Sequence, residues 1–269
     1  MAQVSITGII LAVAAVGGVG LFVGVFLGIA ALKFKVEVDE KEEAVLAALP
    51  GNNCGGCGFP GCSGLAAAIA KGEAAVNTCP VGGEAVGKRI AEIMGVEAGE
   101  SQRMVAFVQC QGDCDKTTVD YEYYGIEDCR MLSFVPNGGA KSCNYGCLGY
   151  GSCVKACPFD AIHVENGVAK VDKEACKACG KCVEACPKNL ITLIPYDAKY
   201  AVACSSQEKG PVAMKECTAA CIGCQLCKKN CPADAVTVEN FNATIDYDKC
   251  EGCGACMEKC PRKSIVAHS

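Results

Sequence analysis

Several residue types are scarce in this chain, and their scarcity narrows what it can do. It has no Trp, only two His among 269 residues, and 6% aromatic residues. So few histidines argue against histidine-rich metal sites and histidine-based catalysis. The net charge of −5 argues against a nucleic-acid partner, because proteins that bind nucleic acids neutralise phosphates with an excess of Lys and Arg. A chain this poor in large side chains builds a weak conventional core, so metals, disulfides or partners must supplement it.

Cysteine is the residue that the chain has in excess, with 25 copies. Disulfide scaffolds reach this density, but mainly in short secreted chains. Metal-binding proteins of reducing compartments reach it too. The compartment therefore decides what the cysteines do.

The amino-terminal segment indicates the compartment. Ile6 to Leu32 is almost wholly apolar and uncharged, which is enough to cross a hydrocarbon core that needs ~20 residues. A signal peptide would have a basic start and a shorter apolar run. We therefore expect a retained transmembrane helix within 1–35. Lys33 and Lys35 follow the run, so the positive-inside rule places the N-terminus outside and the rest of the chain in the reducing cytoplasm, where cysteines act as metal ligands. Gly20, Gly24 and Gly28 share one face of this helix, which favours close packing against a partner helix.

The carboxyl-terminal cysteines follow the bacterial dicluster ferredoxin pattern. Two runs have intervals of two, two and three residues, and each run ends in Cys-Pro, at Pro232 and Pro261. In this pattern the fourth cysteine of a run ligates the other cluster, whereas zinc ribbons use paired C-x-x-C knuckles. The predicted ligand sets are Cys221, Cys224, Cys227 and Cys260 for one [4Fe–4S] cluster, and Cys231, Cys250, Cys253 and Cys256 for the second.

The same unit occurs twice, with a shift of 74 residues. PFDAIHVENGVAKVDKEAC aligns without a gap to PADAVTVENFNATIDYDKC, and each stretch predicts a strand, an Asn turn and a second strand. The one departure is Tyr150, which stands where the later copy has Cys224. Cys143 is the nearest replacement, and a three-iron cluster is the competing hypothesis. The expected sets of the first copy are Cys143, Cys147, Cys153 and Cys186, and Cys157, Cys176, Cys179 and Cys182.

A fifth site lies nearer the apolar helix. LPGNNCGGCGFPGC contains three cysteines, and its glycines let the backbone close around a ligand and donate N–H groups to sulfide. Ala-rich stretches with helical spacing at 41–49, 63–71 and 84–94 predict a small helical module around one cluster. Its expected ligands are Cys54, Cys57, Cys62 and Cys79.

Five cysteines remain outside these sets: Cys110, Cys114, Cys129, Cys204 and Cys217. They suffice for a sixth cluster with one thiol to spare. Alternatively, they are small buried hydrophobic residues. The sequence leaves both interpretations open, so five clusters are expected and six are allowed.

The apolar helix, LPGNNCGGCGFPGC with Cys79, and the ferredoxin Cys-Pro runs occur in an order that resembles the RnfB family, one of the components of the Rnf complex, over essentially the full chain. The two ferredoxin copies resemble the long form found in anaerobic bacteria. The resemblance implies a complex of the bacterial cell membrane that passes electrons from reduced ferredoxin to NAD⁺ and moves Na⁺ or H⁺. A member of the RnfB family would be the ferredoxin-side relay beside other membrane and peripheral subunits.

The predicted architecture is α+β, with a transmembrane anchor (1–35), a helical 4Fe-4S module (36–96), a cysteine-containing connecting region (97–142) and two ferredoxin-like modules (143–195 and 196–269). The chain offers no acid–base pair, no nucleophile constellation and no Rossmann unit, so we expect no catalytic residues and no bound NAD⁺ or flavin. From chain order, the electron path should end near Cys54–Cys79 at the membrane. Lys228, Lys229, Lys259, Arg262 and Lys263 are either an ordinary solvated surface or a landing site for acidic ferredoxin. The alternative function is an anchored polyferredoxin that feeds another reductase without ion pumping.

Overall fold

The computed structural model describes residues 6–33, 39–99 and 102–268. The long helix α1 (Ile6–Lys33) has no acidic residue in its first turn and only Lys33 in its last. Its described side chains are exposed, including Leu21 and Phe22. A helix that is apolar on every side has the composition of a membrane span, and the window Val13–Ala30 is long enough to cross the bilayer.

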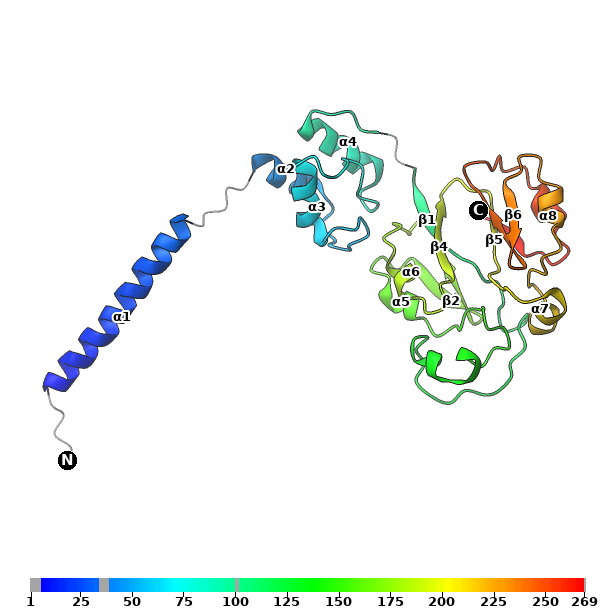
Figure 1. Ribbon diagram of the computed structural model, residues 1–269, viewed down its shortest axis with the longest axis horizontal. Helices are drawn as coiled ribbons and strands as arrows, with labels where there is room; N and C mark the ends of the chain where they lie inside the picture. The colour runs from blue at the N-terminus through cyan, green and yellow to red at the C-terminus, as the bar shows by residue number, and fades with distance from the viewer. Residues whose placement is uncertain (1–5, 34–38, 100–101, 269) are drawn as a thin grey trace.

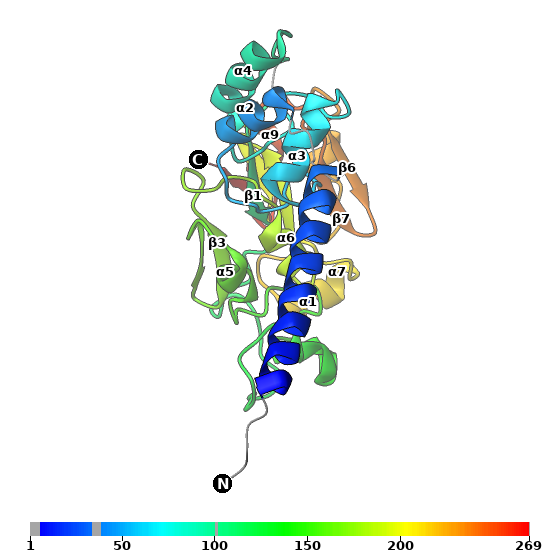
Figure 2. The same ribbon diagram turned by 90° about the vertical axis from the view of Figure 1, so that its left-hand side faces the viewer.

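The helical module consists of α2 (Glu40–Ala48), α3 (Gly61–Ala70) and α4 (Gly83–Met94), which form one group in Figures 1 and 2. These helices confirm the three stretches expected from Ala-rich helical spacing. Asp39 caps α2 by accepting a 3.0 Å hydrogen bond from the Lys41 amide. Val45, Leu65, Ile69 and Ile90 are fully buried together with two of the expected ligands, Cys62 and Cys79. The fold of this module thus places thiols inside its own apolar core.

Each ferredoxin-like module contains the hairpin expected from the repeat. In the first module β2 (Ile162–Glu165) pairs antiparallel with β3 (Val168–Val171), and in the second β6 (Val236–Glu239) pairs with β7 (Asn242–Ile245). The turns begin at Asn166 and Asn240, and both residues have φ of 46°. Asn tolerates this left-handed conformation better than most residues, which explains why it opens both turns. The α+β class is confirmed.

A second pair of sheets joins each module to the chain that precedes it. β1 (Met104–Val108) pairs with β4 (Ile191–Pro195), and β5 (Tyr200–Val202) pairs with β8 (Ile265–Ala267). Val108 lies opposite Ile191 and Val202 lies opposite Ile265. The sequence did not predict these pairings, because each strand bonds a partner at the far end of the module (Figure 1).

The remaining helices are short and lie beside the cysteine runs. Four of them start directly before or at a ligand and end beside a Cys-Pro pair. These four are α5 (Ser152–Ala156), α6 (Lys181–Ala185), α8 (Leu226–Lys229) and α9 (Ala255–Glu258), with α7 (Gly210–Glu216) before the second module's run and the 3₁₀ turns η1 (Met131–Phe134) and η2 (Pro136–Gly138) in the connecting region. Helices of this length need external support, which the thiol sites can provide.

Candidate iron–sulfur sites

The second module brings one predicted ligand set around a single cavity. About 360 Å³ of empty space is lined by Cys221, Cys224, Cys227 and Cys260. Cys227 is buried, whereas Cys224 is exposed. Burial raises the pKa of Cys227 to about 11, and the neighbouring Cys221, Cys224 and Cys260 contribute to this rise. Four thiols from two separate runs therefore meet, as cross-ligation in a dicluster ferredoxin requires.

The backbone is arranged to stabilise sulfur at every Cys-Pro pair. In each case the amide four residues later donates a hydrogen bond to the cysteine sulfur. The sulfurs are those of Cys157 (from Ala161, 3.4 Å), Cys186 (from Leu190, 3.5 Å), Cys231 (from Ala235, 3.3 Å) and Cys260 (from Ser264, 3.3 Å). Such N–H groups favour thiolate and help to set the potential of a bound cluster.

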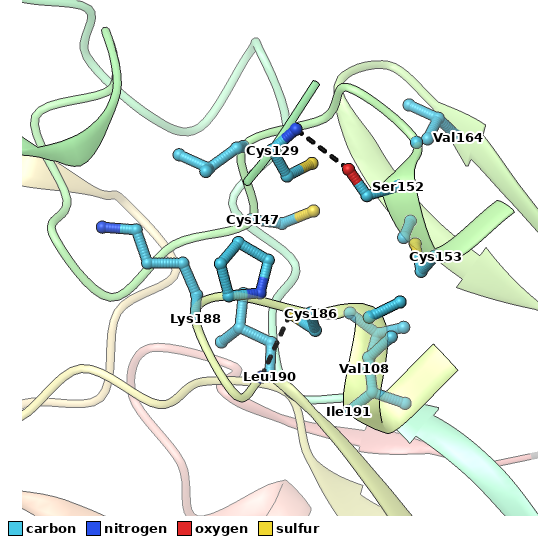
Figure 3. A pocket seen from close by; sticks show the side chains of 15 residues that line it. Val108, Cys129, Cys147, Ser152, Cys153, Val164, Cys186, Lys188, Leu190 and Ile191 are labelled. Carbon is cyan, nitrogen blue, oxygen red and sulfur yellow. Dashed lines mark hydrogen bonds between the residues drawn. The ribbon is translucent and has the colours of Figure 1, made fainter. Parts of the chain in front are cut away.

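The first module has an equivalent cavity of about 400 Å³, but a different fourth thiol lines it. Cys147, Cys153 and Cys186 are present as expected, and the fourth is Cys129 (Figure 3). Eleven of the thirteen residues that line the second module's cavity have their 74-residue counterparts here. The two exceptions are Gly149 and Tyr150. The structure therefore does not bring Cys143, the expected replacement, to this site.

Cys129 reaches the cavity because the connecting region folds over the start of α5. Its amide donates to Ser152 Oγ at 2.9 Å, and Ser152 Oγ donates to Asp128 Oδ1 at 3.1 Å. Tyr150 packs edge-on against Tyr123, with ring centroids 5.8 Å apart, instead of lining the cavity. Spacing alone does not predict this arrangement, because Cys129 is separated from its neighbours by a long irregular segment.

The two remaining ferredoxin sets are also brought together. Burial raises the pKa of Cys182 to about 11, and the thiols that contribute to this rise are those of Cys176, Cys179 and Cys157. Burial likewise raises the pKa of Cys256, with further contributions from Cys250, Cys231 and Cys253. Each group contains the four members of one predicted set and no other cysteine.

The helical module brings three of its four expected ligands close together. Burial raises the pKa of Cys79, and the nearby Cys57 and Cys62 add to that effect. The Gly82 amide donates to Cys79 Sγ at 3.4 Å. Cys54 is half-buried and interacts with Cys179 of the first module. A Cβ added to Gly56 would lie 2.6 Å from the Cys179 carbonyl oxygen, so the two loops touch at a point where only glycine fits.

The letters GCGFPG at 56–61 also fit the spacing G-x-G-x-x-G. That fingerprint binds dinucleotides only where it follows a strand and opens a helix. Here it follows the irregular segment after α2, and Cys57 and Cys62 lie within and beside it. The setting is that of a thiol-bearing loop.

A third cavity lies between the two modules. About 310 Å³ of empty space is lined by Cys110, Cys143, Cys204 and Cys217. Four cysteines whose roles were open or assigned elsewhere from the sequence thus meet at one place. Cys114, the last of the unassigned thiols, is exposed and lies outside this cavity.

The donor chemistry fits iron–sulfur clusters. All 25 cysteines are free thiols. Within residues 6–33, 39–99 and 102–268, no three His, Cys, Asp or Glu side chains converge closely enough to hold a single metal ion. The thiols instead stand apart around cavities, which suits a cluster several atoms wide better than one zinc ion with Zn–S bonds near 2.3 Å. Lys188 and Arg262 occupy equivalent positions at two of the cavities and offset the thiolate charge.

Family models agree with these sites. A model described as "Putative Fe-S cluster" matches residues 49–81, and models described as 4Fe-4S dicluster domains match residues 140–187, 175–236 and 220–265. The chain is therefore an electron-transfer protein that carries several 4Fe–4S clusters.

Whole-chain relatives define the family, and each is the B component of an ion-translocating complex. The chain is 51% identical over 243 residues, covering 90% of this chain and 73% of the relative, to that of the Na(+)-translocating ferredoxin:NAD(+) oxidoreductase complex of Acetobacterium woodii. It is 43% identical to that of the ion-translocating oxidoreductase complex of Methanosarcina acetivorans, covering 88% and 90% of the two chains. It is 40% identical to that of the proton-translocating ferredoxin:NAD(+) oxidoreductase complex of Clostridium ljungdahlii, covering 86% and 82%. The chain belongs to the RnfB family of the Rnf complexes, and with α1 it is associated with a membrane.

Proposed function

We propose that this chain is the electron-transfer subunit of a membrane ion-translocating ferredoxin:NAD⁺ oxidoreductase, and that it accepts electrons from reduced ferredoxin. The observation that carries the proposal is the meeting of thiols from separate runs around shared cavities, in a chain that is similar over 90% of its length to a component of such a complex. Bound 4Fe–4S clusters supply one-electron transfer. The chain's own residues hold, bury and order them.

Five ligand sets follow. Four are those expected from spacing: Cys54, Cys57, Cys62 and Cys79; Cys157, Cys176, Cys179 and Cys182; Cys221, Cys224, Cys227 and Cys260; and Cys231, Cys250, Cys253 and Cys256. In the fifth, Cys129 joins Cys147, Cys153 and Cys186 in place of Cys143, because Cys129 lines that cavity.

The contacts between loops suggest the order of these sets. Cys54 and Gly56 of the helical module touch the loop around Cys179, so the helical site adjoins the first module. The helical module also follows α1 in the chain, which makes it the membrane-proximal end. The second module exposes Cys224 and Cys253, two ligand thiols at the surface of the far end. We assign that end to electron input.

Basic side chains beside the exposed thiols suit an acidic ferredoxin. Lys228, Lys229, Lys259 and Lys263 are exposed near these runs. Arg262 differs from them, because its Nη2 donates to the Cys217 carbonyl at 2.9 Å and its Nε is buried. The docking surface therefore consists of the four lysines, and its attraction should weaken as salt screens it.

The membrane arrangement follows from α1. Lys33 in its last turn places that end in the cytoplasm by the positive-inside rule and the N-terminus outside. Gly20, Gly24 and Gly28 leave open space along α1, where an added Cβ would meet nothing within 4 Å. We assign this face to a helix of another subunit.

Anaerobic membrane vesicles that contain the whole complex provide the test. Reduced ferredoxin should drive NAD⁺ reduction, and Cys221→Ala, which removes a ligand at the input end, should abolish it while the other subunits still assemble. An unchanged rate in that variant would contradict the proposal. A chain that is reduced by ferredoxin but purifies without other subunits would instead be a polyferredoxin for another reductase.

A further inference from the structure

We infer that Cys110, Cys143, Cys204 and Cys217 form a sixth 4Fe–4S site, which lies between the two ferredoxin-like modules and connects them. The inference deepens the proposed function and rests on it for the type of cluster. It stands on the third cavity, whose 310 Å³ is comparable to the 360 and 400 Å³ of the two thiol-lined cavities inside the modules.

The four thiols form two equivalent pairs. Cys143 and Cys217 occupy the same position of the 74-residue repeat. Cys110 and Cys204 each follow, by two residues, the strand residue that lies opposite Ile191 or Ile265, and those two isoleucines are themselves 74 residues apart. Each module thus presents a strand thiol and a loop thiol to one shared space. Chance burial of leftover cysteines would not produce this pairing.

Hydrogen bonds at the strand thiols repeat in the same way. The Cys147 amide donates to Cys110 Sγ at 3.3 Å, and the Cys221 amide donates to Cys204 Sγ at 3.2 Å. Cys147 and Cys221 are equivalent ligands of the two flanking sites. The central thiols therefore contact the backbone of one ligand set in each module, which places the sixth site directly between those sets.

The rest of the cavity wall is small and close. Besides the thiols it includes Gly112, Gly146, Ala203, Ala219 and Ala220. A Cβ on Gly112 would lie 2.6 Å from Thr117 Oγ1 and 3.3 Å from Cys217 Sγ, so that position has no room for a side chain. If the four cysteines were only small hydrophobic residues, close packing should have filled the space between them.

Positive charge lies beside this set. Lys141 Nζ donates to the carbonyls of Gly112 (2.9 Å) and Gly167 (2.8 Å), and its charge acts on Cys110. Arg262 donates to the Cys217 carbonyl. A four-thiolate cluster is anionic, and these fixed cations stabilise it. With the sixth site, Cys114 alone remains without a ligand role.

The test uses the full chain, purified anaerobically and reconstituted with iron and sulfide. The wild type should hold about 24 irons and as many acid-labile sulfides. Cys110→Ala and Cys217→Ala should each lose about four of each, and the matched control Cys114→Ala should lose none. A wild type that saturates near 20, or single variants that lose no iron, would overturn the sixth site.

A double variant guards against general unfolding. Cys143→Ala with Cys217→Ala should lose about four irons in total, no more than either single change, because both thiols bind one cluster. A loss near eight would mean that the two thiols serve separate sites. Iron near 20 with intact ferredoxin-driven NAD⁺ reduction would remove the sixth site and leave the proposed function standing, whereas loss of that reduction in Cys221→Ala tests the function alone.

Discussion

The two ferredoxin-like modules have the same hairpins and the same Cys-Pro hydrogen bonds, yet they complete equivalent cavities differently. The second module uses Cys224 from its own run, and that thiol is exposed. The first has Tyr150 at that position and takes the buried Cys129 from the connecting region. The segment between Cys110 and Cys143 is twenty residues longer than the one between Cys204 and Cys217, and it carries Cys129. The comparison indicates that the backbone frame is fixed, while a ligand can come from any segment that reaches the cavity.

Removing iron tests what the modules share, and it should have the largest effect. Anaerobic chelation should unfold both modules, because their short strands and one-turn helices depend on bound metal. Hydrogen exchange should show lost protection in β2–β3 and β6–β7 alike. The helical module has an aliphatic core, so α4 should keep more protection than either hairpin. Equal protection of the hairpins before and after chelation would contradict the shared dependence.

Substitution at the two equivalent positions should separate the modules. Cys224→Ala should lose about four irons, or one if a three-iron cluster forms, because it removes a ligand. Tyr150→Ala should keep the full iron content, since Tyr150 does not line the cavity. Iron and sulfide counts with EPR of the three-iron signal measure both. Iron loss in Tyr150→Ala would show that the first cavity depends on this position after all.

A ligand swap should make the first module resemble the second. Cys129→Ala should lose the iron of one cluster, and adding Tyr150→Cys should restore it, because residue 150 is equivalent to Cys224. Metal content and the EPR spectrum of the reduced protein provide the readout. Cys143→Ala is the matched comparison, and its loss should not be restored by Tyr150→Cys. If instead Tyr150→Cys restores iron to Cys143→Ala, then Cys143 is the ligand that the first module uses.

Surface charge should give the smallest difference. Lys229→Glu with Lys259→Glu should slow reduction by ferredoxin several-fold at low salt and make the rate less dependent on salt. Lys155, which is equivalent to Lys229 in the first module, provides the control: Lys155→Glu should change the rate little. Stopped-flow bleaching of the clusters measures the rate. Equal slowing by both changes would place ferredoxin elsewhere.

Local spacing predicted the parts of the fold and sites that local sequence determines. The hairpins follow from alternation around Asn166 and Asn240, and the cross-ligated sets follow from runs that end in Cys-Pro. The site of Cys129 could not be predicted in this way, because its position depends on how an irregular segment crosses α5. Cys110 and Cys204 were missed as a pair because they repeat at 94 residues, not 74. The strand pairings β1–β4 and β5–β8, which only the fold reveals, make them equivalent.

The iron and acid-labile sulfide content of the anaerobically purified full chain is the most direct test of whether these thiols hold clusters. We expect a brown protein with about 24 irons and 24 sulfides per chain and no stoichiometric zinc. A colourless chain that binds zinc, or one whose cysteines are joined as disulfides without iron, would contradict this expectation.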